Sequence, residues 1–368
     1  MTIAAMRQPA SILIDMRRLA VTFTLALATG WLFLQTGMPA PYLMGSLFGV
    51  WFTGAAIRPL RAHLGVARWF HVPVILGLGV LIGATFNRDV LAQADQWILT
   101  LTTMIGTTLV VTTIGYNFLR RVRGYPPPLA FLCSVPGGQA EVIAIARDMV
   151  REDYAVALFH LVRVAIVFVS TPLLLGLLEG SGAVAASNLR LQDMPGIFNL
   201  PAKQLLQFGG FALVGYVVAR LCRIPMPHLV GPMGLSTAMH LLGWAEIPRI
   251  NEFVILAQLA IGGAVGARLA QVPFTEVMGY LRDALANTLV ILTAYLVAAL
   301  VIIQITSADF LSIWLAFVPG GLYEVTLLAL VFGFDVAFVA FHHTIRVLMI
   351  FLSLPGLASW LKRQSGSS

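Results

Sequence analysis

One short motif occurs twice in this chain of 368 residues, and no other feature restricts the fold as much. The first copy, residues 135–142, reads VPGGQAEV, and the second, residues 318–325, reads VPGGLYEV. The second copy lies 183 positions after the first. The same offset relates further pairs of polar or special residues: His160 and His343, Arg163 and Arg346, and Pro172 and Pro355. Agreement at one offset over so many positions indicates an internal duplication.

A second shared pattern opens each half. Pro-x-Pro-x-Leu-x-Gly begins at Pro39 and again at Pro225, 186 positions later. Two glycines, Gly79 and Gly83, then recur after 183 positions, so the halves differ by a small insertion or deletion. Because proline is tolerated in the first turn of a helix, we expect each Pro-x-Pro to start one.

The composition is that of a membrane protein. Hydrophobic residues make up 59% of the chain and charged residues 11%, and the mean hydropathy is +0.89. No soluble enzyme or DNA-binding domain fits, so we interpret the formal net charge of +7 through topology and expect no nucleic-acid partner. Cys133 and Cys222 form no CxxC or Cys/His spacing, which gives no support for a disulfide or a structural zinc.

Each half offers six apolar segments. In the first half they cover residues 19–37, 41–57, 70–86, 97–118, 128–146 and 155–178. In the second they cover residues 205–221, 227–242, 253–267, 284–305, 310–331 and 336–360. The first segment follows basic residues as a signal peptide would, but it precedes Pro39 as residues 205–221 precede Pro225, so we keep it as a helix.

The fifth segment of each half contains Pro-Gly-Gly near its middle. Proline removes a backbone donor and glycine lowers helix stability, so we expect the helix to break there. In hydrocarbon such a break persists only where protein or a water-filled cavity covers the freed backbone. If the segment crosses the membrane, each half has six spans and the repeats are parallel. If it enters and returns, each half has five spans and the repeats are inverted.

Loop charge distinguishes the two models, because Lys and Arg accumulate on the cytoplasmic side. With the N-terminus inside and both segments re-entrant, 17 of the 23 Lys and Arg lie inside: Arg7, Arg17, Arg18, Arg58, Arg61, Arg68, Arg120, Arg121, Arg123, Arg147, Arg151, Arg220, Arg223, Arg268, Arg282, Lys362 and Arg363. Four lie outside, Arg88, Arg190, Lys203 and Arg249, and Arg163 and Arg346 lie within spans. The parallel model moves Arg147, Arg151, Arg220, Arg223, Arg268 and Arg282 outside, so the inverted model is favoured.

The predicted fold is therefore an all-α polytopic membrane protein with two inverted-topology repeats. Each repeat has about five transmembrane helices plus one re-entrant or broken Pro-Gly-Gly hairpin. We expect a cytoplasmic segment 1–18, a first repeat 19–178, a periplasmic linker 179–203, a second repeat 204–361 and a cytoplasmic tail 362–368. We expect both termini to be cytoplasmic.

Glu141 and Glu324 fall in the first turn of the helix that restarts after each break. The free N–H groups at a helix start favour an anion. One interpretation makes the two glutamates proton or sodium sites beside the substrate, and the other makes them N-terminal caps, with Gln139 and Tyr323 adding local hydrogen bonds. Both interpretations stay open.

Arg163 lies about 10 residues into its span, which is ~14 Å at 1.5 Å per residue. His160 precedes it by three residues on the same helical face, and His343 and Arg346 repeat the arrangement. A bare arginine at that depth costs about 3 kcal/mol, so it needs a partner. We favour an ion pair with a motif glutamate, and the alternative is a substrate carboxylate held bidentately. The histidines either relay a proton or are satisfied within the core.

The predicted site lies where the two halves meet. The residues predicted to bind substrate are Gly137, Gly138, Gln139, Gly320, Gly321, Tyr323, Arg163 and Arg346. The residues predicted to hold the coupling ion are Glu141, Glu324, His160 and His343. Two half-helix starts that converge at the membrane midplane would concentrate positive potential there.

In Pro-Gly-Gly-x-x-Glu, the downstream His-x-x-Arg and the Pro-x-Pro-x-Leu-x-Gly openings, the chain resembles the AbrB family of bacterial inner-membrane proteins. The resemblance covers residues 19–360, including the duplication. Members are labelled transcriptional regulators or ammonia monooxygenases. The first label implies an indirect effect on gene expression, since nothing here binds DNA. The second implies a copper or iron site, yet His228, His240, His342 and His343 show no ligand spacing for one.

Inverted halves with re-entrant hairpins are also similar to the glutamate and citrate secondary transporters. We therefore expect a secondary transporter of a small organic anion or amino acid, coupled to protons or sodium. A membrane-embedded ligand sensor is the alternative, and a membrane monooxygenase is third. We expect no enzymatic activity, no cofactor and no metal. The expected partners are the lipid bilayer and a small-molecule substrate, and a homodimer is left open.

Overall fold

The computed structural model describes residues 9–92, 94–137, 139–273, 277–306 and 308–365, and every regular element within them is helical. In the first half these are α1 (Pro9–Gln35), α2 (Pro41–Ala56), α3 (Arg58–Arg61), α4 (Arg68–Gly83), α5 (Arg88–Leu91), η1 (Ala94–Gln96), α6 (Trp97–Asn117), the π-helical η2 (Phe118–Val122), α7 (Pro127–Ser134), α8 (Gln139–Met149) and α9 (Asp153–Leu178). The linker holds α10 (Gly180–Gln192) and η3 (Ile197–Asn199). The second half contains α11 (Ala202–Leu221), α12 (Pro227–Leu241), α13 (Asn251–Ala270), α14 (Met278–Ile302), α15 (Phe310–Phe317), α16 (Leu322–Phe332) and α17 (Val336–Ser365).

Six stretches of the described residues are long and apolar enough to cross a membrane. They are Ala94–Val122, Asp153–Leu178, Ala202–Leu221, Asn251–Ala270, Met278–Ile302 and Val336–Ser353. The all-helical fold of the described residues is thus confirmed, and the six stretches are compatible with a multi-pass membrane protein. The ten predicted spans exceed these six, and the other four coincide with α1, α2, α4 and α12. Of these, α2, α4 and α12 have 16, 16 and 15 residues, shorter than the about 17–25 that a span usually needs.

Helices α2 and α12 begin in the same way at equivalent prolines, Pro41 and Pro227. The proline ring fixes a helical φ, and its missing N–H would have had no partner in a first turn. The residues before them, Ala40 and Met226, have φ of 47° and 50°. Such left-handed conformations are uncommon for residues other than glycine. The predicted helix starts are confirmed, and in both halves the residue before the helix has the same strained, left-handed conformation.

Both Pro-Gly-Gly sequences interrupt a helix, as predicted. Helix α7 ends at Ser134 and α8 begins at Gln139, while α15 ends at Phe317 and α16 begins at Leu322. Gly137 has φ of +109°, a backbone conformation that residues with a Cβ atom rarely adopt. Each break therefore leaves a helix end and a helix start inside the protein.

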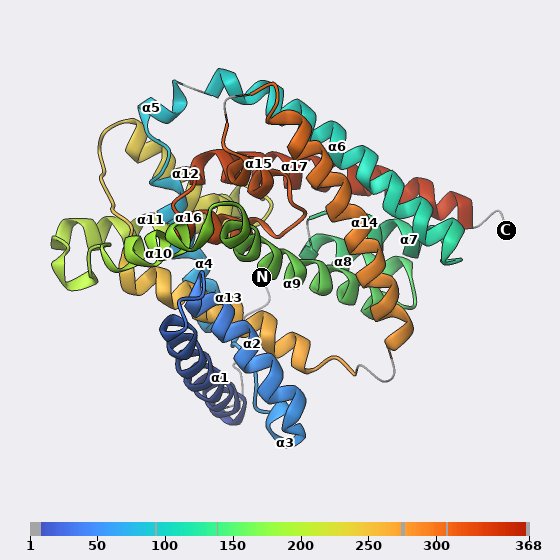
Figure 1. The fold of residues 1–368 in the computed structure, drawn as a ribbon, viewed down its shortest axis with the longest axis horizontal. Helices are drawn as coiled ribbons and strands as arrows, with labels where there is room; N and C mark the ends of the chain where they lie inside the picture. The colour runs from blue at the N-terminus through green and yellow to red at the C-terminus, as the bar shows by residue number, and fades with distance from the viewer. Residues whose placement is uncertain (1–8, 93, 138, 274–276, 307, 366–368) are drawn as a thin grey trace.

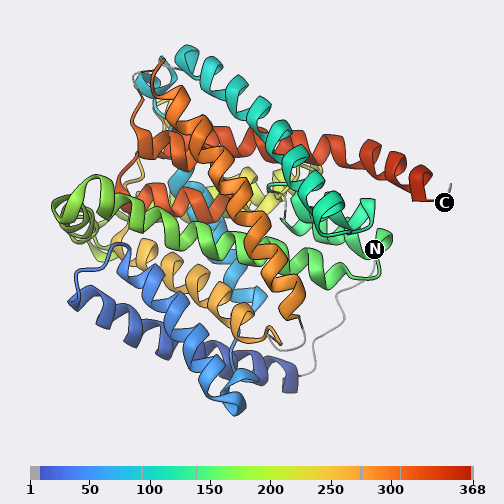
Figure 2. The ribbon, with the colours of Figure 1, turned by 45° about the vertical axis from the view of Figure 1, so that its right-hand side comes forward.

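The helices form two packed groups, and each group draws equivalent helices from both halves. The α13 group contains α1, α2, α4, α11, α12 and α13, in which α2 packs on α13 and, equivalently, α12 packs on α4. The α14 group contains α6, α7, α8, α9, α14, α15, α16 and α17. In Figure 2, α1 and α2 (blue) lie at one edge, and α6 (teal) and α17 (red) lie toward the opposite edge. Figure 1 shows α14 crossing α6 on the side away from α1 and α2.

Glycines allow the two halves to approach closely within the α13 group. A Cβ built on Gly79 of α4 would lie 2.7 Å from the carbonyl oxygen of Leu229 in α12. One built on Gly262 of α13 would lie 2.7 Å from the carbonyl oxygen of Leu43 in α2. These are equivalent contacts, and each joins one half to the other. Backbones can meet this closely only where the side chain is missing.

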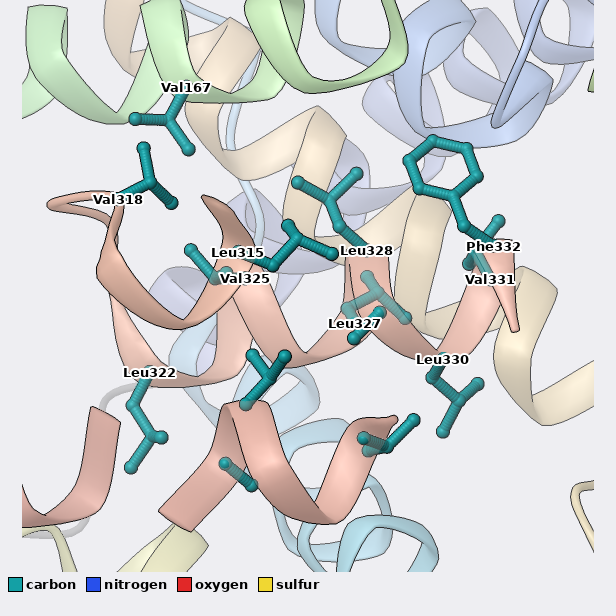
Figure 3. Close-up of a cluster of buried hydrophobic side chains, with 14 of the residues drawn as sticks. Val167, Leu315, Val318, Leu322, Val325, Leu327, Leu328, Leu330, Val331 and Phe332 are labelled. Carbon is teal, nitrogen blue, oxygen red and sulfur yellow. The ribbon is translucent and has the colours of Figure 1, made fainter. Parts of the chain in front are cut away.

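Helix α16 lies in the centre of the hydrophobic core. Figure 3 shows apolar side chains around it, with Leu322, Val325 and Leu328 on the helix itself. Val167 of α9 and Val318 of the preceding break lie in the same cluster. All of these are buried, so the second broken helix is covered by protein on its apolar sides.

The linker is more structured than its polar sequence suggested, because it folds into α10 and packs on α9 and α16. Arg190 donates to the carbonyl oxygen of Phe332 at 3.3 Å, and Arg249 donates to that of Leu330 at 3.5 Å. Asn251 also donates to the carbonyl oxygen of Leu191. The linker thus covers the carboxyl end of α16, where cations are favourable.

We expect Gly79→Ala to lower the thermal unfolding temperature in detergent by several degrees. The new methyl group must displace the α12 backbone, and such overpacking costs about 1–3 kcal/mol. The matched control is Gly234→Ala, since a Cβ on Gly234 of α12 meets no atom within 4 Å. Alanine favours helix over glycine by about 0.8–1 kcal/mol, so the control should be neutral or slightly stabilised. Equal unfolding temperatures for the two variants would contradict close backbone packing.

Candidate functional site

The two buried arginines hold the ends of the broken helices. Arg163 of α9 donates from Nη1 to the carbonyl oxygen of Val135 and from Nη2 to that of Cys133, both at 2.6 Å. These carbonyls lie at the end of α7, where the helix offers them no N–H. The guanidinium also places positive charge at the negative end of the helix dipole. Arg163 therefore caps α7.

Arg346 of α17 does the same for α15. It donates to the carbonyl oxygens of Phe317 at 2.8 Å and Val318 at 3.0 Å, with a longer contact to Gly320 at 3.5 Å. Val318 is the repeat equivalent of Val135, so one carbonyl in each half receives the same cap. Both arginine side chains are buried.

The histidines complete each cap. His160 Nε2 lies 3.2 Å from the carbonyl oxygen of Leu132, and His343 Nε2 lies 2.7 Å from that of Leu315. A carbonyl oxygen only accepts, so Nε2 must carry the proton in both rings. His343 Nδ1 then accepts from Arg346 Nη2 at 2.7 Å. A second proton on this ring would face a guanidinium donor, so the geometry favours a fixed, neutral His343 over a proton relay.

The partners of the arginines correct one interpretation of the sequence. Within the described part of the chain, no ion pair joins Arg346 to Glu324, and Arg346 donates to carbonyls and to His343 instead. The ion pair predicted with a motif glutamate is therefore not formed between Arg346 and Glu324, and pairing with Glu141 stays a prediction because the Glu141 side chain lies outside the described residues. A buried arginine needs neutralising acceptors, and several backbone oxygens at a helix end supply them.

The two halves exchange contacts at the breaks. A Cβ on Gly137 would lie 3.4 Å from Ile350 Cδ1 and 3.7 Å from Arg346 Nε, both on α17. A Cβ on Gly320 would lie 3.5 Å from Val167 Cγ1 on α9, and Val167 is the repeat equivalent of Ile350. Each Pro-Gly-Gly break thus packs against the capping helix of the other half.

A cavity of about 600 Å³ lies between the two helix groups. Its lining includes Gly321, Tyr323 and Glu324 at the start of α16. The opposite wall comes from α4, α12 and α13, and Ile143 of α8 and Val347 of α17 also contribute. Cavities of 300–1,000 Å³ with a few convergent polar groups are typical of small-molecule sites. Of the predicted substrate residues, Gly321 and Tyr323 line this cavity.

Glu324 is the buried acid of this cavity. Only 2% of its surface is exposed, and its Oε2 atom has no hydrogen-bond partner among the described residues. The carboxylate lies over Gly321, since a Cβ built on that glycine would lie 2.9 Å from Oε1. A buried carboxylate oxygen without a partner is costly, so this position is suited to a proton, a cation or a ligand donor.

The cavity also contains basic residues that the sequence analysis did not assign to a site. They are Arg68 and His71 of α4, His228 of α12 and Arg268 of α13. The His71 ring packs edge-on against Tyr323 with centroids 6.0 Å apart, and its buried Nδ1 atom lacks a partner within the described residues. In the sequence, Arg68 and Arg268 serve only as loop charges that indicate the membrane topology, and His228 is considered only as a possible metal ligand. None of these four residues has a basic residue at the equivalent position of the other half, so a comparison of the two halves could not identify them.

A second hollow of about 790 Å³ adjoins the cavity. It is lined by α9, α13 and the segment after α13, and it shares Ile143 and Arg268 with the cavity. Arg268 is exposed, so it faces solvent-accessible space rather than the packed core. The second hollow thus borders the cavity that contains Glu324.

The first motif is described less fully. Gly138 and the side chains of Gln139 and Glu141 lie outside the described residues, although the backbone of α8 begins at Gln139. Their predicted roles stay predictions.

Other polar clusters carry structural contacts. Asp283 of α14 accepts a hydrogen bond from the Tyr125 hydroxyl at 3.1 Å and pairs with Arg123. Burial, reinforced by Asp283, raises the pKa of Tyr125. His342 contacts Thr100 and the carbonyl oxygen of Phe338. Among the described residues, no group of three or more His, Cys, Asp or Glu side chains is placed to hold a metal ion.

We expect Arg346→Gln to destabilise the protein by about 2–5 kcal/mol, because it leaves buried carbonyls at the end of α15 without donors. Combined with Glu324→Gln, the two effects should add within about 0.5 kcal/mol, since the side chains share no contact. The measurement is a double-mutant cycle of unfolding in detergent, with exposed Arg220→Gln as the control arginine. A coupling above about 1 kcal/mol would restore the ion pair.

Comparison with known proteins adds the following findings. The family model described as "Transition state regulatory protein AbrB" matches residues 47–362. The Escherichia coli (strain K12) protein named "Putative regulator AbrB" is 26% identical, over 89% of this chain and 92% of that protein. The Bacillus subtilis (strain 168) "Uncharacterized protein YhjN" is 24% identical, over 89% of each. No solved structure matches the chain.

Proposed function

This chain belongs to the AbrB family, and from its cavity we propose that it is a secondary transporter of a small organic anion or amino acid, coupled to protons or sodium. The observation that carries the proposal is the Glu324 carboxylate. It lies at the start of a helix that follows a break, keeps one oxygen without a partner among the described residues, and lines a cavity between two helix groups.

The position of the cavity supports transport. It is bounded by α4, α12 and α13 on one side and by α8, α16 and α17 on the other. A displacement of one group against the other would change which side of the membrane reaches the site. Alternating access in proteins with repeated halves commonly works by such motion around a fixed site.

The charges of the cavity support an anionic substrate. Arg268 lines the cavity beside the start of α16, whose free N–H groups carry a partial positive charge. In our proposal the substrate anion binds there, while a proton or sodium neutralises Glu324. The inverted repeats and the re-entrant course of α7–α8 and α15–α16 belong to this proposal.

The name of the Escherichia coli relative supports a second candidate function. A membrane-embedded sensor would bind a ligand in the same cavity and pass the signal to a regulatory partner without moving the ligand. Flux distinguishes the two functions, because a sensor binds without net uptake.

We expect Glu324→Gln to retain binding and folding but to abolish ion-driven accumulation in proteoliposomes, leaving at most uncoupled exchange. Glutamine keeps the shape of the side chain but cannot take up a proton or neutralise sodium. The experiment measures uptake of a ligand identified by thermal shift, with imposed proton and sodium gradients. The matched control is Glu246→Gln, at an exposed glutamate outside the cavity. Uptake with unchanged ion dependence in Glu324→Gln would make Glu324 a cap.

For topology, we expect Phe198→Cys to be labelled from the periplasm and Arg121→Cys from the cytoplasm. Phe198 is 96% exposed in the linker and Arg121 is exposed, whereas Ser187 of the same linker is buried and unsuitable as a probe. The background would carry Cys133→Ala and Cys222→Ser. Labelling of both positions from the same side would refute the inverted arrangement.

A further inference from the structure

Four basic residues line the cavity: Arg68 and His71 of α4, His228 of α12 and Arg268 of α13. Arg68 and His71 are three residues apart in α4, so they share a helical face. The His71 ring packs edge-on against Tyr323, with ring centroids 6.0 Å apart, which brings it next to the first turn of α16. Two arginines from different helices therefore border the same cavity as Glu324.

We infer that the substrate of this site is a dicarboxylate, with one carboxylate bound by Arg268 and the other by Arg68. This inference rests on the proposed transport function and specifies its substrate class. A guanidinium binds a carboxylate through two parallel N–H donors, so two such groups in one cavity match two carboxylates. His71 and His228 line the same cavity and offer ring nitrogens as further polar contacts.

The charge balance of the cavity supports two anionic groups. The charged and titratable side chains that line the cavity with Glu324 are Arg68 and His71 from α4, His228 from α12, Arg268 from α13 and Tyr323 from α16. Two arginines thus share the cavity with a single carboxylate. Once a proton or sodium neutralises Glu324, a monoanion would leave the cavity with a net positive charge, which is less complementary than a dianion. A dicarboxylate brings the loaded cavity to a net charge near zero.

Access is consistent with this assignment. Arg68 and Arg268 are both exposed, and Arg268 lines both the cavity and the adjoining hollow, so an incoming anion can reach the guanidiniums. The cavity of about 600 Å³ is large enough for a dicarboxylate of a few carbons together with water.

The test uses the full-length protein purified in detergent and a panel of dicarboxylates from malonate to adipate. Each acid is paired with its half-amide, which has nearly the same shape but one negative charge less. We expect at least one dicarboxylate to raise the unfolding temperature and to be taken up by proteoliposomes, with its half-amide binding about 10- to 100-fold more weakly.

Two variants assign the carboxylates to residues. Arg268→Gln and Arg68→Gln should each weaken dicarboxylate binding about 10- to 100-fold while changing half-amide binding much less, because one anionic contact is lost in each. Arg220→Gln, at an exposed arginine of α11 outside the cavity, should leave both affinities unchanged.

The outcomes separate this inference from the transport function. Equal affinity for dicarboxylates and half-amides would overturn the dicarboxylate assignment, and so would variants that weaken the binding of both ligands equally. In either case, uptake of a monoanion would preserve the transport function. Dicarboxylate binding without uptake would support the assignment and leave a sensor. If no anion, singly or doubly charged, binds or is taken up, both the dicarboxylate assignment and the proposed transport function are overturned.

Discussion

A helix that ends inside a membrane protein leaves carbonyl oxygens that receive no hydrogen bond from lipid or from the N–H groups of the helix itself. In this chain, Arg163 and Arg346 donate to those oxygens, and His160 and His343 add one further contact each. The breaks at Pro-Gly-Gly depend on these donors, and the cavity depends on the breaks, because α16 can start beside it only if α15 ends. One set of hydrogen bonds therefore supports both the fold and the site.

The repeat is nearly symmetric in its framework and asymmetric in its chemistry. Close glycine contacts, proline helix starts and capped breaks occur once in each half. The basic residues of the cavity do not, since none of them has an equivalent basic residue in the other half. The linker adds to this difference, because its Arg190 covers the end of α16. Duplicated backbone geometry thus positions a single site to which the two halves contribute different charged residues.

The pattern of apolar residues and the positions of proline and glycine allowed the helices to be predicted well. Proline and glycine act locally, so the starts at Pro41 and Pro227 and both breaks could be inferred from sequence. The arginine partners could not, because a sequence shows candidate acids but not free backbone oxygens. The same limit hid the cavity residues: Arg68, His71 and Arg268 come from helices that adjoin α16 only in three dimensions. The helical structure of the linker was also missed, since its packing on α9 and α16 outweighs its glycine and serine content.

The exchange of helices between the two halves has a consequence for the history of the chain. Each half sends three helices into the α13 group, where Gly79 meets Leu229 and Gly262 meets Leu43. Each capping helix also packs against the break of the opposite half. A half made as a separate polypeptide would lack these close backbone contacts and the packing that covers its break. An ancestral unit with this fold would therefore have assembled as a pair before its gene was duplicated and joined, and once joined, the two copies were free to diverge at single positions without a second gene having to follow.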